Sequence, residues 1–360
     1  MAATDLSPGL PAREPITNEE LALAARNHGM PLEGLRYDIT PVGMHYLLIH
    51  FDIPALDADT WAIEVGGRVT RPLTLSIDDL RSRPAVSMPV TMECAGNGRA
   101  RLDPRPHSQP WIDEAIGTAT WTGTPLSPIL GEAGLEPDAL EVVFRGADHG
   151  EQGGVEQDYE RSLSIADATR DEVILAYELN GQALPPQHGF PVRLLVPGWY
   201  GMTSVKWLRS ITAVAEPFDG FQMWAYRLRQ REEDEGAPVT RMMPRALMIP
   251  PGFPEFFTRS RTIDAGTVTL EGRAWSGWGI VTRVEVSADG GASWTEAVLS
   301  EPLGAHAWRA WTHDWTAEPG EHELMVRASD EAGNVQPLEQ PWNHHGLSNN
   351  LVQHVSVLIR

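Results

Sequence analysis

The sequence predicts two domains of different fold class, a mixed α+β domain followed by an all-β sandwich. The chain has 360 residues, and an ordinary domain has about 100 to 200. Short strand-like and helix-like segments mix up to residue 228, whereas after residue 262 strands are separated only by turns. We therefore expect an arm and helix over 1–37, the α+β domain over 38–228, a charged and Pro-rich linker over 229–261 and the sandwich over 262–360.

The composition is that of an ordinary globular protein, with 42% hydrophobic and 21% charged residues. The formal net charge of -21 argues against nucleic acid or an anionic membrane surface as a partner. It would suit a basic protein partner, although it more often only keeps a protein soluble. No apolar run approaches the roughly 18 residues of a membrane span, and Met1–Pro11 has no signal core or twin arginine. We expect a cytoplasmic protein as written, or a periplasmic one if a signal peptide was removed.

One short helix is predicted directly after the arm. Thr17 and Glu20 have the spacing of a capping box, and apolar residues follow until the stop at Asn27-His28-Gly29.

The α+β domain is predicted from short apolar runs interrupted by serine-capped helices. The expected strands are Tyr46–Phe51, Trp61–Val65, Val90–Met92, Glu141–Arg145, Val173–Tyr177 and Val192–Val196. The expected helix caps are Ser76, Ser127 and Ser164. No Gly-rich nucleotide loop stands between a strand and a helix, so a nucleotide cofactor has little support.

The sandwich is predicted from alternating apolar residues with turns between them. The expected strands include Val268–Leu270, Val284–Val286, Leu324–Val326 and Val352–Ile359. The segment also holds Trp275, Trp278, Trp294, Trp308, Trp311, Trp315 and Trp342. These tryptophans are too many for one small core, so we expect some of them at an interface, the alternative being that they cover the sandwich surface.

The single cysteine, Cys94, follows a strand and precedes the turn Ala95–Gly98. One cysteine excludes an intrachain disulfide and a Cys-rich metal cluster. Three interpretations compete: a small buried apolar residue, a nucleophile that would need a base, or a thiolate bound to a metal. The glycine-containing turn allows close approach of the backbone to a bulky group, and Arg99 adds positive charge, which favours a metal centre and an anion.

A second group of residues is suited to holding a phosphate. His188, Arg193, Ser204 and Lys206 alternate with glycines whose backbone amides are accessible. Such donors bind phosphate without a P-loop. A solvated basic loop is the alternative, but basic residues are scarce in this acidic chain.

These residues together resemble the sulfite oxidase family of molybdenum enzymes. The resemblance is carried by Cys94–Arg99, His188–Arg193 and Ser204–Leu208, and by the C-terminal Ala328–Asn343. It covers about residues 38 to 360 in order. It implies a sulfite oxidase fold and an immunoglobulin-like dimerisation domain in place of a generic sandwich.

The resemblance also implies roles for individual residues. Cys94 would be the thiolate ligand of molybdenum, while His50, His188, Arg193, Ser204 and Lys206 would hold the molybdopterin. Arg99 would face the substrate oxyanion, and Tyr226 would lie beside the metal. The implied reaction is oxidation of sulfite or a related sulfur oxyanion by oxygen-atom transfer, carried out by a homodimer.

Two residues depart from the family pattern. Leu48 and His345 stand where the family has arginines, which leaves Arg99 and makes the pocket less cationic. This favours the branch that includes sulfane dehydrogenases, unless another basic residue such as Arg101 or Arg161 fills the gap.

The electron acceptor is expected to be a separate protein such as a cytochrome. The chain has no Cys-x-x-Cys-His motif and no additional domain for a b-type haem, so we expect no haem in it. Two alternatives to sulfite oxidation stay open: oxidation of another sulfur substrate, and a cofactor-free binding protein dominated by its immunoglobulin-like half.

Overall fold

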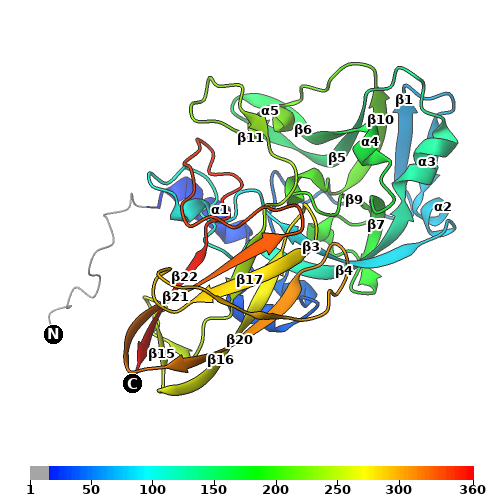
Figure 1. Ribbon diagram of the computed structural model, residues 1–360. Coiled ribbons are helices and arrows are strands. Elements are labelled where there is room, and N and C mark those ends of the chain that lie inside the picture. Colours follow the sequence, from blue (N-terminus) through cyan, green and yellow to red (C-terminus); the bar gives the residue numbers. More distant parts are fainter. Residues whose placement is uncertain (1–15) are drawn as a thin grey trace.

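Two β-rich units make up the structure, a computed structural model that describes residues 16–360. In Figure 1 the sandwich strands, coloured yellow to red, lie beside the α+β unit, whose strands run from blue to green. The predicted arm falls mostly outside the described residues. Within residues 16–360, no helix has the length and apolar character needed to cross a membrane.

The α+β unit contains two five-stranded sheets. The first has the order β2-β1-β10-β5-β6, and the second has β3-β4-β7-β8 with β9 also paired to β7. The strands of the first are β1 (Ala62–Gly67), β2 (Leu73–Ser76), β5 (Glu141–Gln152), β6 (Val155–Ser164) and β10 (Leu208–Val214). Those of the second are β3 (Val86–Glu93), β4 (Ile116–Pro125), β7 (Ile174–Leu179), β8 (Gln182–Ala183) and β9 (Arg193–Leu195).

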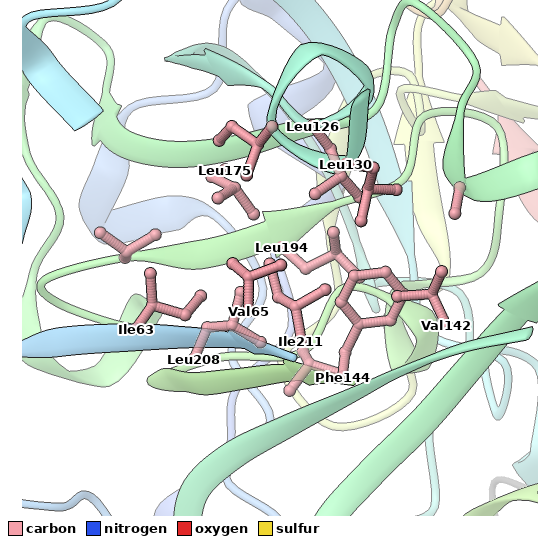
Figure 2. Close-up of a cluster of buried hydrophobic side chains, with 14 of the residues drawn as sticks. Ile63, Val65, Leu126, Leu130, Val142, Phe144, Leu175, Leu194, Leu208 and Ile211 are labelled. Atoms are coloured by element: carbon pink, nitrogen blue, oxygen red, sulfur yellow. The ribbon is translucent and has the colours of Figure 1, made fainter. Parts of the chain in front are cut away.

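Apolar side chains from both sheets form the largest core of this unit. Figure 2 shows Val65, Phe144 and Ile211 of the first sheet pointing toward Leu175 and Leu194 of the second. All five side chains are buried, so their transfer from water stabilises the pairing of the sheets. Leu194 belongs to β9, so this core holds the strand that begins at Arg193, and a second buried cluster holds Val90 and Met92 of β3.

Three of the four predicted helix starts are confirmed. Thr17 forms a capping box with Glu20 at α1 (Asn18–Arg26), and Ser76 forms one with Asp79 at α2 (Ile77–Arg81). The Ser164 hydroxyl caps α4 (Ile165–Ala168).

The predicted cap at Ser127 is wrong. Helix α3 (Leu126–Ala133) starts one residue earlier, and its N-cap, Pro125, makes no side-chain capping bond. The remaining helix is α5 (Phe221–Ala225), and short 3-10 turns cover Leu32–Arg36, Val42–Met44, Arg99–Arg101, Pro186–His188 and Gly201–Thr203.

The predicted strand Tyr46–Phe51 is also wrong, because only one β-bridge, His28 to Leu47, forms there. The amide of Ile49 instead donates to the Asn27 side chain at 2.7 Å. An alternating apolar pattern thus belongs to an irregular segment whose side chains line a cavity.

The C-terminal unit is a sandwich of a four-stranded sheet, β13-β16-β20-β19, and a six-stranded sheet, β14-β15-β22-β21-β17-β18. The long strands are β16 (Gly266–Trp275), β17 (Val281–Ser287), β20 (Arg309–Ala317), β21 (Gly320–Asp330) and β22 (Gln353–Ile359). The short ones are β13 (Arg245–Met248), β14 (Phe253–Pro254), β15 (Arg261–Ile263), β18 (Thr295–Glu296) and β19 (Val298–Leu299). A separate two-stranded sheet joins β11 (Arg227–Leu228) to β12 (Ala237–Pro238).

The structure differs from the predicted linker over 229–261. All four residues of β13 are buried, and this strand pairs with β16. Pro244 and Pro250 flank β13 without interrupting it, so the prolines that suggested a linker instead bracket a strand.

Tryptophans of the sandwich lie at an interface within the chain. Trp275 and Trp308 belong to a buried cluster that also contains Met30 and Tyr200 of the other unit. The Trp308 indole donates to the carbonyl of Asp38 at 2.8 Å. The expectation that some tryptophans lie at an interface is therefore confirmed, and this interface joins the two units.

A buried ion cluster crosses the same interface. The Arg245 guanidinium, only 1% exposed, contacts Glu93 at 3.1 Å and Asp113 at 2.6 Å. Arg101 is the second cation on Asp113. The Trp275 indole donates to the other oxygen of Glu93 at 2.9 Å. The charges of two carboxylates and two guanidiniums thus compensate one another where β13 meets the end of β3.

Replacing Arg245 by methionine is expected to destabilise the protein by about 3–5 kcal/mol, because a buried carboxylate is left without its partner. Urea unfolding measures the loss. Arg68→Met, which removes two ion pairs, to Glu136 and Asp138, of an arginine that is 45% exposed, should change the midpoint very little. Equal losses in the two variants would contradict a special role for the cluster.

Candidate active site

Cys94 begins a tight turn directly after β3. Its amide donates to the carbonyl of Ala115 and its carbonyl accepts from the amide of Asn97, both at 2.9 Å. Gly98 has a φ of 85°, a conformation that favours glycine. Cys94 is partly exposed and packs against the buried cluster that contains Val90 and Met92 of β3.

The turn folds back over Arg99. The Nη1 of Arg99 donates to the carbonyl of Gln109 at 2.9 Å, and its Nε donates to the carbonyl of His345 at 2.8 Å. A Cβ on Gly96 would lie 2.6 Å from the guanidinium, so a larger residue there would displace Arg99. Burial raises the pKa of the Cys94 thiol, and the charge of Arg99 opposes this rise.

The six residues expected to bind the cofactor line one cavity of about 650 Å³, which we call the inner cavity. They come from separate parts of the chain: His50, Cys94, His188, Arg193, Ser204 and Lys206. Tyr46, Asp148, Tyr159 and His45 are further lining residues. The structure thus brings together residues up to about 150 positions apart in sequence.

Two cations of the inner cavity are held by backbone carbonyls. Arg193 donates to the carbonyls of His188 at 3.1 Å and Ser204 at 2.8 Å, and Lys206 donates to that of Leu48 at 2.8 Å. Burial, with the charge of Arg193, lowers the pKa of Lys206. Asp148 is the acidic residue of the lining, so cations outnumber anions and the cavity favours an anionic ligand.

Polar atoms in the lining are left for a ligand. Within residues 16–360, buried His45 Nε2 and Asp148 Oδ1 have no hydrogen-bond partner. The rings of His45 and His188 meet edge to face with centroids 5.6 Å apart. Burial lowers the pKa of His45 to about 4 and that of His188 to about 2, so both rings are neutral near pH 7. A group with a phosphate, ring N–H donors and acceptors fits these donors, acceptors and cations.

A second hollow, which we call the outer funnel, meets the inner cavity at Cys94. It has a volume of about 1330 Å³ and is lined by the three residues predicted to be catalytic, Arg99, Tyr226 and His345. Leu48, His50, Cys94 and Tyr226 line both hollows. A thiolate at this junction can bind a metal that is supported from the inner cavity and reached from the funnel.

The two residues that depart from the family pattern, Leu48 and His345, both line the funnel. Leu48 lines it, and burial lowers the pKa of His345 to about 4, so this ring is neutral near pH 7. Among the described residues, neither Arg101 nor Arg161 lines either hollow. Arg101 pairs with Asp113, and Arg161 lies 5.5 Å over the ring of Tyr226.

Sequence reasoning missed several lining residues. His45 and Asp148 face the inner cavity, and Arg26 and Trp224 face the funnel. The position of Arg26 in the last turn of α1 was predictable, but the docking of that helix beside the funnel was not. Burial, followed by the nearby Cys94, raises the pKa of Tyr226 to about 12, so its hydroxyl stays protonated and can donate.

Comparison with known proteins agrees with this geometry. Residues 50–222 match the family described as the oxidoreductase molybdopterin binding domain, and residues 248–359 match the Mo-co oxidoreductase dimerisation domain. The fold and the site therefore define a molybdopterin-binding oxidoreductase.

Relatives narrow this class. The chain is 34% identical to the mitochondrial sulfite oxidase of Rattus norvegicus over 388 residues, covering 98% of this chain and 69% of that one. It is 32% identical to nitrate reductase [NADH] 1 of Oryza sativa subsp. japonica, covering 95% of this chain and 40% of that one. The crystal structure of the sulfane dehydrogenase SoxCD from Paracoccus pantotrophus superimposes with a TM-score of 0.80 at 27% identity, covering 98% of this chain and 91% of that one.

The chain belongs to the sulfite oxidase family. It has the two-domain fold expected from the resemblance, a molybdopterin-binding domain followed by a β-sandwich dimerisation domain. The chain spans 62% of the length of the Homo sapiens sulfite oxidase, to which it is 35% identical.

The buried histidines predict how stability depends on pH. His45 and His188 bind fewer protons when folded than when unfolded, because their folded pKa values lie below the ordinary 6.5. The contribution of these neutral rings to the free energy of unfolding is fully present above about pH 6.5 and is lost as the pH falls toward 4. In the cofactor-free protein, His45→Gln should therefore reduce the drop in urea midpoint between pH 7.5 and pH 5.

His149 provides a control with the opposite sign. Hydrogen bonds that the His149 ring donates to Asp158 and Glu156 raise its pKa, so it stabilises the folded state at low pH. His149→Gln should enlarge the acid loss. If both variants shifted the drop in the same direction, the assignment of a neutral His45 would be wrong.

Proposed function

We propose that this chain is a molybdenum-cofactor-dependent oxidoreductase that oxidises sulfite or a related sulfur oxyanion. The observation that carries the proposal is the place of Cys94, a partly exposed thiol between a cation-lined cavity and a funnel that contains Arg99. A metal thiolate, a phosphate-binding cavity and an anion-binding arginine are all needed in such an enzyme.

The chain's own residues would divide the binding of the cofactor. Cys94 would supply the thiolate, Arg193 and Lys206 the charges that neutralise a phosphate, and His45 and His188 neutral ring nitrogens. His50 would meet the cofactor at the boundary with the funnel. The bound group would supply the two-electron redox chemistry and the oxygen atom.

Other residues would act on the substrate. Arg99 is held by two carbonyl contacts, which orient its guanidinium toward an oxyanion in the funnel. The protonated hydroxyl of Tyr226 can donate a hydrogen bond beside Cys94. Burial of both groups excludes water and strengthens these interactions.

The sequence identities do not distinguish between possible substrates, because the chain matches a sulfite oxidase and a nitrate reductase at similar identity. The positive charge of Arg99 favours an anionic substrate, and sulfite is our first candidate. A second candidate is a reduced or sulfane sulfur substrate, as the name of the structural relative suggests, and Leu48 with neutral His345 supports it. Sulfite turnover at ordinary efficiency, with none on thiosulfate or sulfane-bearing proteins, would exclude this second candidate.

We also propose the partners and the location. A homodimer through residues 248–359 is supported by the match to the dimerisation domain. Electrons would pass to a separate acceptor such as a cytochrome, and the acidic net charge would suit a basic one. The protein would be cytoplasmic, or periplasmic if a leader is removed, which fractionation of cells would decide.

Cys94→Ser should lower sulfite oxidation by at least about a thousandfold, because a serine oxygen is a poor substitute for a soft thiolate. The variant should fold normally and retain pterin, since Arg193 and Lys206 are unchanged. Metal analysis, pterin fluorescence and steady-state assays measure the three quantities after expression in a host that makes the cofactor. Normal turnover by the variant would rule out the ligand assignment, and a wild-type chain without molybdenum would favour a cofactor-free binding protein.

Restoring the two missing arginines should tighten sulfite binding. In Leu48→Arg with His345→Arg we expect the KM for sulfite to fall by about tenfold or more, because each charge-assisted contact contributes roughly 1.5–3 kcal/mol. Leu140→Arg, at a leucine that is 47% exposed and lines neither hollow, is the control and should leave KM unchanged. An unchanged KM in the double variant would mean that Leu48 and His345 do not face the anion.

A further inference from the structure

Arg229 is a buried cation that has no carboxylate partner among the described residues. It follows β11 and is only 2% exposed. Its Nη2 donates to the carbonyl of Trp224 at 2.6 Å, and its Nε makes a long contact of 3.4 Å to the carbonyl of Glu235. Within residues 16–360, no ion pair includes Arg229, and its Nη1 has no hydrogen-bond partner.

This guanidinium lies directly behind the wall of the outer funnel. Its Cζ is 4.4 Å from the ring centroid of Trp224, which lines the funnel. The ring of Trp224 meets that of His345 edge to face, with centroids 6.2 Å apart. The amide of His344 donates to the carbonyl of Arg229 at 2.7 Å, so the loop that carries His345 is tied to this arginine.

The same wall contains a second polar atom without a partner among the described residues. Within the described part of the chain, His345 Nε2 is buried and has no hydrogen-bond partner. Two backbone carbonyls and the face of Trp224 offset the burial of the Arg229 charge only in part, because its Nη1 stays unpaired within the described residues. A buried positive charge behind a ring nitrogen without a partner favours a ligand with negative charge at this wall.

The other charges around Arg229 do not cancel it. Glu232 and Asp234 exert an attractive field, but Glu232 is exposed and Asp234 accepts from the amide of Arg231. Arg227 adds positive charge and is itself paired with Glu235. Solvent weakens the field of the exposed carboxylates more than that of a buried guanidinium.

We propose that Arg229 is a specificity-determining residue that attracts a sulfur oxyanion to the funnel wall formed by Trp224 and His345. It would supply from behind the wall part of the positive charge that Leu48 and His345 do not provide. This inference rests on the proposed function for the identity of the oxyanion, but not for the charge of the site.

The electrostatics of His345 support the inference. After burial and His344, Arg229 is the next cause that lowers the pKa of His345, and Arg99 follows it. A charge that disfavours a proton at His345 favours an anion at the same place. Arg99 and Arg229 thus act on the ring of His345 together.

Steady-state kinetics with sulfite test the role of Arg229. Arg229→Met should raise KM by about tenfold, as expected for one lost charge interaction, with kcat within about twofold. Arg229→Lys, which keeps the charge, should recover most of the difference. Arg227→Met loosens the same loop without removing the buried charge, and its KM should stay at the wild-type value. Arg229→Gln, which can keep a bond to the Trp224 carbonyl, replaces Arg229→Met if that variant fails to fold.

Sulfate binding to the cofactor-free chain tests the charge of the site independently of turnover. With 13C-labelled histidine, the His345 ring signal, assigned with His345→Gln, should shift on titration with sulfate. The Kd should rise about tenfold in Arg229→Met and be restored in Arg229→Lys. Sulfate binding without sulfite turnover would count against the proposed function alone. Equal sulfate affinity in wild type and Arg229→Met, or no binding to the wild type, would overturn the role of Arg229.

Discussion

The contact of Arg245 with Glu93 and Asp113 is the constraint on which the site depends. Glu93 is the residue before Cys94, and its two oxygens are held by Arg245 and by the indole of Trp275. Both carboxylates are fully buried, and burial alone would raise their pKa values. For Asp113, the charges of Arg101 and Arg245 reverse this effect and lower the pKa. The cluster therefore fixes the end of β3, and with it the position of Cys94, which is the next residue.

This arrangement makes the sandwich part of the active site. Ser348 donates its amide to the carbonyl of Ala95 at 2.7 Å, and the Asn349 side chain donates to that of Gly98 at 2.7 Å. The carbonyl of His345 accepts from Arg99. The C-terminal unit thus holds the Cys94–Arg99 turn by three hydrogen bonds, while Cys94 lines the inner cavity and Gly96 and Arg99 line the outer funnel. A domain whose family description mentions only dimerisation here also positions the predicted substrate arginine.

Much of this could be predicted from the sequence, and the failures have physical causes. The fold class, three helix caps and the sandwich strands followed from local patterns. The six residues expected to hold the cofactor, chosen from residue chemistry and family resemblance, line one cavity. The strand predicted at Tyr46–Phe51 failed because its backbone bonds to Asn27, and the cap at Ser127 failed because Pro125 already starts the helix. His45 and Arg229 could not be found, because their importance lies in unpaired atoms that only tertiary packing creates.

Hydrogen exchange of the Cys94–Arg99 turn tests the central claim most directly. In Arg245→Met, the amides of Asn97, Arg99 and Ser348, each hydrogen-bonded at this turn, should exchange at least about tenfold faster than in the wild type. Amides of the β5–β6 pairing, which has no residue in the cluster, should be accelerated less than those of the turn, because they report only the global loss of stability. Unchanged exchange at the turn, with the same protein folded, would contradict the claim that the buried Arg245 cluster fixes the position of Cys94.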